Sequence, residues 1–141
     1  MALYRAHVLV CCGTGCTSSS SPKIMKQFEE LLPEYGLAQE IQIVKTGCFG
    51  LCAEGPVVVV YPEGIMYYRV TPEDVQEIIS EHLMKGRFVH RLMSLTSADL
   101  KDNAEADNSF FAKQMRVALR NCGFINPEKI EEYIAHDGYL A

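Results

Sequence analysis

Four of the six cysteines form two spaced pairs among glycines, an arrangement suited to binding a metal or a metal cluster. The first group reads Cys-Cys-Gly-Thr-Gly-Cys over residues 11–16, and the second reads Gly-Cys-Phe-Gly-Leu-Cys over residues 47–52. In a reducing compartment such thiols favour metal binding or redox chemistry over disulfides. The glycines let backbone N–H groups approach the sulfurs, which stabilises thiolates bound to a metal.

Several kinds of site compete for these cysteines. Structural zinc uses pairs separated by two to four residues, so the spacings of four and three residues here permit a four-cysteine zinc site. A thioredoxin-type dithiol needs Cys-x-x-Cys, which neither pair has, and a Rieske centre needs histidines that both loops lack. A phosphate-binding loop needs a Lys-Ser/Thr ending that is missing after Gly13-Thr14-Gly15. The residues therefore leave an iron–sulfur cluster and a structural zinc site as candidates.

Hydrophobic spacing predicts the elements that must hold these loops. Short apolar or alternating runs, typical of strands, occupy residues 5–11, 40–45, 57–61 and 65–70. A helix with Ser21 as its cap and Pro22 in its first turn is expected to stop at Pro33. A second helix begins at Thr71 and ends at Gly86, with His82 on its surface.

The predicted order is β-α-β-β-β-α, an α/β arrangement in which a crossover helix joins two parallel strands before a hairpin and a closing helix. This order is typical of thioredoxin-like folds. Each cysteine group directly follows one of the first two strands. If those strands are parallel neighbours, both loops emerge at one edge of the sheet and four thiols converge there.

The composition changes after about residue 88. Residues 97–109 are polar and acidic, as in a linker, and helices are expected over 110–121 and from 126 to about 135. These helices have too few apolar residues to form a core of their own. We therefore expect a first domain over 1–88 and a linker with short helices over 89–141 that pack on it or on another protein.

The cysteine pattern resembles that of the thioredoxin-like [2Fe–2S] ferredoxins: C-x4-C, then C-x3-C after the gap from Thr17 to Gly47. Residues 46–52, 55–64 and 70–75 resemble the N-terminal domain of the flavin-bearing, NAD(P)H-oxidising subunit of multimeric hydrogenases and complex I-like NADH dehydrogenases. Residues 111–127 and 131–135 resemble the segment that leads into the flavin domain of that subunit.

The resemblance implies a [2Fe–2S] cluster that transfers one electron at a time. Its expected ligands are Cys11 and Cys16 on one iron and Cys48 and Cys52 on the other. Adjacent Cys11 and Cys12 point in opposite directions from an extended chain, and Cys11 gives the spacing of four residues that the resemblance implies. Cys12 is expected to pack beside the site.

The chain ends at Ala141, without the glycine-rich domain that holds FMN and NAD(P)H in the resembling subunits. We therefore expect an N-terminal electron-transfer module rather than a complete enzyme. Its implied partners are other iron–sulfur and hydrogenase or dehydrogenase subunits, and a homodimer is compatible with the sequence. The alternative is a zinc-binding domain that serves assembly only.

Charge and hydropathy exclude two other classes of partner. The net charge is −5 and the charges are mixed along the chain, so nucleic acid is not an expected partner. No apolar run approaches the roughly 20 residues that span a bilayer, and the N-terminus lacks a signal-peptide pattern. The expected location is cytoplasmic, without direct membrane insertion.

Overall fold

The computed structural model describes residues 4–93, 115, 117–118, 120–121, 125–126 and 128–140. Four strands form one sheet in the order β2-β1-β3-β4. Their bounds are β1 Ala6–Cys11, β2 Ile41–Thr46, β3 Val58–Tyr61 and β4 Ile65–Tyr67. β1 and β2 are parallel, whereas β3 is antiparallel to both β1 and β4. The predicted order of these four strands along the chain and the parallel first pair are confirmed.

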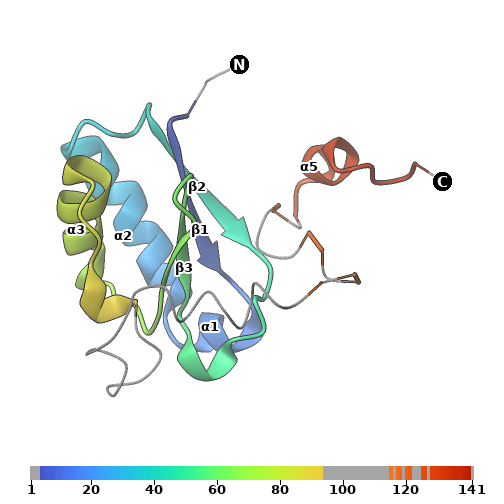
Figure 1. The fold of residues 1–141 in the computed structure, drawn as a ribbon, viewed down its shortest axis with the longest axis horizontal. Coiled ribbons are helices and arrows are strands. Elements are labelled where there is room, and N and C mark those ends of the chain that lie inside the picture. Colours follow the sequence, from blue (N-terminus) through green and yellow to red (C-terminus); the bar gives the residue numbers. More distant parts are fainter. Residues whose placement is uncertain are drawn as a thin grey trace.

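Helices α2 (Ser21–Glu34) and α3 (Asp74–Glu77) cover one face of this sheet (Figure 1). α3 continues directly into a π-helical segment, η2 (Ile78–Leu83). The apolar stripes of these helices meet alternate residues of the strands in the main core. Fully buried members are Val8, Val10, Ile24, Phe28, Val58, Tyr67, Val75, Ile78 and Ile79. Complete burial of a large apolar side chain contributes about 1.5–3 kcal/mol to the stability of the fold. Packing in this core therefore fixes the position of the strand ends.

Helix α2 differs from its predicted bounds at both ends. Ser20, rather than Ser21, is the cap residue, and it adopts a left-handed φ of 83°. Ser21 lies in the first turn, buried, and its hydroxyl donates a hydrogen bond to the carbonyl oxygen of Cys11 at 2.7 Å. Pro33 lies inside the last turn rather than ending the helix, because the φ that proline imposes is itself helical.

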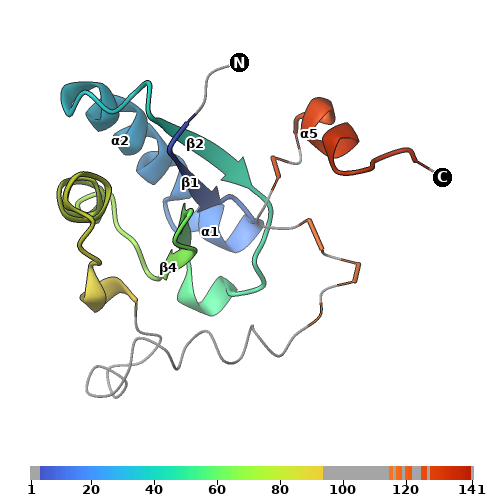
Figure 2. The ribbon, with the colours of Figure 1, turned by 45° about the horizontal axis from the view of Figure 1, so that its top comes forward.

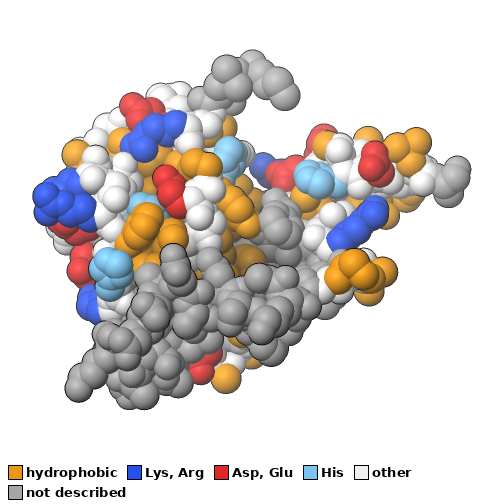
Figure 3. All heavy atoms as spheres, viewed as in Figure 1, with side chains coloured by type: hydrophobic (Ala, Val, Ile, Leu, Met, Phe, Trp, Pro, Cys, Tyr) orange, Lys and Arg blue, Asp and Glu red, His pale blue; other side chains and the backbone are white. Residues whose placement is uncertain are grey.

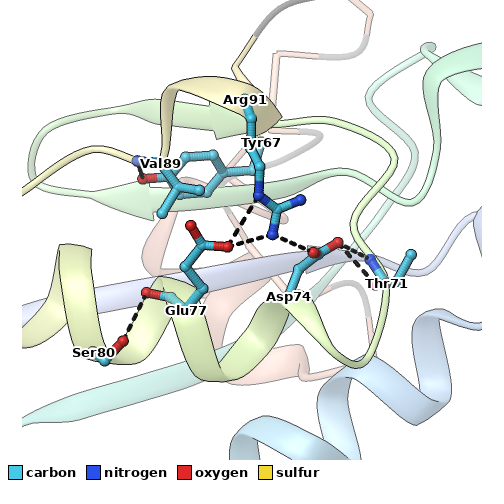
Figure 4. A network of polar contacts seen from close by, with 7 residues as sticks. All are labelled: Tyr67, Thr71, Asp74, Glu77, Ser80, Val89 and Arg91. Carbon is cyan, nitrogen blue, oxygen red and sulfur yellow. Dashed lines mark hydrogen bonds and ion pairs between the residues drawn. The ribbon is translucent and has the colours of Figure 1, made fainter.

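The second helix begins three residues later than predicted, at Asp74 with Glu73 as its cap residue, and hydrogen bonds hold Thr71 beside this start. The Asp74 carboxylate accepts from both the backbone N–H and the hydroxyl of Thr71, at 2.8 and 2.9 Å. The Arg91 guanidinium lies 2.5 Å from Asp74 and also pairs with Glu77 (Figure 4). This network ties the segment after the helix to the helix start.

That segment belongs to the first structural unit. Val89 and Leu92 are buried in the main core, and the Val89 N–H donates to the Tyr67 hydroxyl at 3.3 Å (Figure 4). The Tyr68 N–H donates to the carbonyl oxygen of Leu92 at 2.7 Å. The unit therefore continues beyond residue 88, to Leu92 at least.

The expected surface position of His82 is wrong. Only 4% of His82 is exposed, and its ring lies edge-on to those of Tyr67 and Phe88. The Tyr67 hydroxyl accepts from the Val89 N–H and is also hydrogen-bonded to His82 Nδ1 at 2.7 Å. His82 follows Val75 by seven residues, which places it on the same helical face as the apolar stripe.

The C-terminal helix is shorter than predicted. α5 (Ile130–Ala135) ends where expected but begins later, because the Glu128 N–H donates to the Asn126 side chain in a turn. Buried Ile125 and an ion pair between Lys45 and Glu128 attach this segment beside the end of β2. The linker expected over 97–109 and most of the helix expected over 110–121 lie outside the described residues.

The C-terminal segment exposes apolar side chains to solvent (Figure 3). Those of Ile130, Tyr133 and Ile134 on α5 are 56%, 44% and 53% exposed. Among the described residues, no helix has the length and apolar character needed to cross a bilayer.

Buried His82 predicts a pH-dependent loss of stability in acid. Burial lowers the pKa of His82, although the Glu63 carboxylate opposes this shift. The unfolded chain, with an ordinary histidine pKa of about 6.5, then binds a proton that the folded state does not. We expect the free energy of unfolding to fall as the pH is lowered from 7.5 to 5, as measured by urea unfolding.

The control is His82→Gln, which keeps a side-chain hydrogen-bond partner for the Tyr67 hydroxyl but does not titrate. The variant should show a smaller change between the two pH values than the natural chain. An equal change in both proteins would contradict the assignment of this effect to His82.

Candidate metal centre

The two cysteine loops meet at one end of the sheet because β1 and β2 run in parallel. Cys11 at the end of β1 lies opposite Thr46 at the end of β2. The first loop forms a short helix, α1 (Thr14–Ser18), within a stretch predicted to be a loop. The second contains the turn η1 (Cys52–Glu54), which contacts α1 (Figure 2).

The structure brings the four predicted ligands together as two pairs. Cys11 and Cys16 are each 1% exposed, and their thiols are hydrogen-bonded to each other. The Sγ atoms of Cys48 and Cys52 are 3.8 Å apart. One tetrahedral metal bonded to two thiolates at about 2.3 Å holds its sulfurs roughly 3.8 Å apart. The second pair is therefore spaced to share one metal.

Glycines allow the two loops to interlock around the sulfurs. A Cβ atom on Gly13 would lie 2.9 Å from Cys48 Cβ, and one on Gly55 would lie 2.6 Å from Cys16 Sγ. Both distances are shorter than real Cβ contacts, so larger residues would push the cysteines apart. The cysteine pattern indicates a role for Gly13 but not for Gly55, because Gly55 lies outside both cysteine groups and comes beside Cys16 only in the folded chain.

Backbone N–H groups reach two of the sulfurs. The Gly50 N–H donates to Cys48 Sγ at 3.2 Å, in a loop where Gly50 has a φ of 84°. The Val57 backbone is hydrogen-bonded to Cys16. Such hydrogen bonds stabilise thiolates bound to iron and help to set the reduction potential.

Cys12 faces away from this centre. It continues the series of Val8 and Val10, which point into the main core, and its Sγ lies 3.5 Å from Met25 Sδ on α2. Cys11 instead continues the series of Leu9 and packs with the apolar cluster on the opposite face of the sheet. The alternation of side chains in β1 thus separates the two adjacent cysteines as expected.

The surroundings of Cys16 and Cys52 oppose the ionisation of these two thiols in the free protein. Burial, followed by the neighbouring Cys11 thiol, raises the pKa of Cys16 to about 12. The hydrogen bond to Cys48 and the charge of that residue raise the pKa of Cys52. A bound metal cation reverses this preference, because coordinated thiols are deprotonated. Four thiol donors are a soft set that suits an iron–sulfur cluster or zinc.

Comparisons with known proteins identify the fold and its relatives. A profile of the thioredoxin-like [2Fe-2S] ferredoxin family matches residues 3–83. A 2Fe-2S ferredoxin of Clostridium pasteurianum is 42% identical over 96 residues, which cover 62% of this chain and 94% of that protein. The crystal structure of the wild-type thioredoxin-like [2Fe-2S] ferredoxin from Aquifex aeolicus matches with a TM-score of 0.60 and 36% identity. That match covers 67% of this chain and all of the other.

A shorter match joins this chain to a hydrogenase. Over 27 residues the chain is 67% identical to the NADP-reducing hydrogenase subunit HndC of Solidesulfovibrio fructosivorans. This matched segment covers 19% of this chain and 6% of that subunit. The family profile covers more than half of the chain, and the clostridial relative is covered almost completely. The expected fold is confirmed, and the chain belongs to the thioredoxin-like [2Fe-2S] ferredoxin family.

Proposed function

We propose that this chain transfers single electrons through a [2Fe–2S] cluster, with Cys11 and Cys16 on one iron and Cys48 and Cys52 on the other. The observation that carries the proposal is the convergence of these two pairs, one at 3.8 Å between sulfurs, in a member of a ferredoxin family. When bound, the cluster would supply the one-electron redox couple. No residue here is proposed to transform a substrate.

The two pairs differ in their access to solvent. Cys11 and Cys16 are enclosed by the apolar cluster that contains Val59 and Tyr68. Cys52 is exposed and Cys48 is half-buried. A redox partner would approach from the side of the second loop, while the apolar wall behind the first pair excludes water.

We further propose that this ferredoxin unit works as the N-terminal module of a larger NAD(P)H-dependent hydrogenase or dehydrogenase assembly. The 27-residue match to a hydrogenase subunit supports this role. FMN and NAD(P)H would bind outside the present chain, and the partners would be further iron–sulfur subunits in the cytoplasm. The exposed apolar side of α5 offers such a partner a contact surface.

Structural zinc on the same cysteines is the alternative function. Zinc also forms bonds of about 2.3 Å to thiolate sulfur, so the 3.8 Å separation of Cys48 and Cys52 fits either metal. The two proposals differ in redox chemistry, because zinc does not change its oxidation state.

The first prediction from this proposal concerns composition. Protein purified anaerobically should be red-brown and contain about two irons and two acid-labile sulfides per chain, measured by metal and sulfide analysis. Colourless protein with stoichiometric zinc and no iron would support the alternative instead.

The second prediction concerns the adjacent cysteines. Cys12→Ser should retain the visible spectrum and the iron content, because Cys12 faces Met25. Cys11→Ser should lose the cluster or change its spectrum strongly, because it replaces a thiolate ligand. Visible absorption and iron analysis of both variants provide the comparison. The reverse result would show that Cys12 is the ligand.

A further inference from the structure

One ion pair connects the second cysteine loop to the end of the sheet. Glu54 closes η1, two residues after Cys52, and its Oε2 lies 2.6 Å from the Arg69 guanidinium. The Glu54 side chain is 23% exposed and that of Arg69 is 62% exposed. Oε2 of Glu54 is itself buried and accepts no well-directed hydrogen bond within the described part of the chain. The guanidinium is therefore the charge that offsets this carboxylate.

The main chain holds the same loop independently of these side chains. The Arg69 N–H donates to the carbonyl oxygen of Glu54 at 2.9 Å, and the Val70 N–H donates to that of Pro56 at 3.1 Å. Arg69 adopts a left-handed φ of 52°, which is unusual for a residue other than glycine. Glutamine at this position would meet the same backbone requirement as arginine. A side-chain substitution thus changes the charge while leaving both backbone hydrogen bonds available.

The sign of the electrostatic effect follows from the charge of the centre. Reduction adds one negative charge to a site that four thiolates already make anionic. A carboxylate nearby disfavours the reduced state and lowers the reduction potential, whereas a cation favours it. Glu54 follows Cys52 by two residues within the same turn, η1. Its charge is therefore close to the second cysteine pair.

Resting on the function proposed above, we infer that Arg69 and Glu54 are a positioning pair that tunes the centre. The Arg69 guanidinium neutralises Glu54 beside Cys52 and so keeps the reduction potential higher than an unpaired carboxylate would allow. The two residues act through their charges and through their position beside the second cysteine loop. Neither residue is a metal ligand.

The test is a redox titration of the full chain carrying its cluster, followed by visible absorption. Arg69→Gln should lower the reduction potential, because it leaves a mostly buried carboxylate without its cation. Glu54→Gln should raise it, by a smaller amount, because the Arg69 guanidinium is more exposed and better screened by water. The double variant should lie near the natural protein. Opposite signs are the diagnostic result, since simple loosening of the loop would move both single variants in the same direction.

The matched control is Arg5→Gln. Arg5 forms a similar ion pair with Glu40, with side chains 49% and 52% exposed, at the far end of β1. It lies six residues before Cys11 along an extended chain, or about 20 Å, which is beyond the screening length of about 10 Å at 0.1 M salt. This variant changes the net charge as Arg69→Gln does, but should leave the potential unchanged.

The inference is overturned if Arg69→Gln and Arg5→Gln shift the reduction potential equally. It is also overturned if Arg69→Gln and Glu54→Gln shift the potential in the same direction. If Arg69→Gln does not retain the cluster, the sign of the Glu54→Gln shift decides alone: a rise supports the pair, and a fall or no change rejects it. A natural chain that holds zinc and shows no redox couple overturns the proposed function itself, which is a distinguishable result.

Discussion

The parallel pairing of β1 with β2 is the constraint on which the rest of the structure depends. It sets Cys11 opposite Thr46, so both cysteine loops leave the sheet at the same edge. An antiparallel pairing would send the loops to opposite ends of the strands. The crossover helix α2 makes the parallel pairing possible. Its buried apolar side chains pack against those of β1 and so fix the position of β1 in the main core. A centre built from two distant segments of the chain is thus positioned by ordinary hydrophobic packing.

The loops themselves are held by contacts that the sheet alone does not provide. The Ser21 hydroxyl binds the Cys11 carbonyl oxygen, and Gly13 and Gly55 leave the space that cysteines of the opposite loop occupy. Backbone N–H groups face the sulfurs of Cys16 and Cys48. Burial and the neighbouring thiols raise the pKa of Cys16, and Cys48 raises the pKa of Cys52, whereas a bound metal would favour the thiolate form of both. This crowding of thiols makes the centre sensitive to each charge placed nearby.

Much of this arrangement could be predicted from local sequence. The order of strands and helices along the chain and the opposite directions of Cys11 and Cys12 depend on hydrophobic periodicity, which is a short-range signal. The position of the cap within the run of serines could not be resolved, because neighbouring serines offer the same hydroxyl. His82 was misplaced because a polar residue on an apolar face shows its hydrogen-bond partner only in the folded chain. Gly55 and the Glu54–Arg69 pair depend on contacts between distant loops, for which the sequence carries no periodic signal.

The central claim is that one cluster of two irons bridges the two cysteine pairs. Mössbauer spectroscopy of protein grown on ⁵⁷Fe tests it most directly, because the spectrum reports the number, ligation and oxidation state of the irons. We expect two ferric sites in tetrahedral sulfur environments that are magnetically coupled to a diamagnetic ground state. One-electron reduction should convert one of them to a ferrous site. Absence of iron, or iron in uncoupled single sites, would show that no such cluster bridges the cysteine pairs.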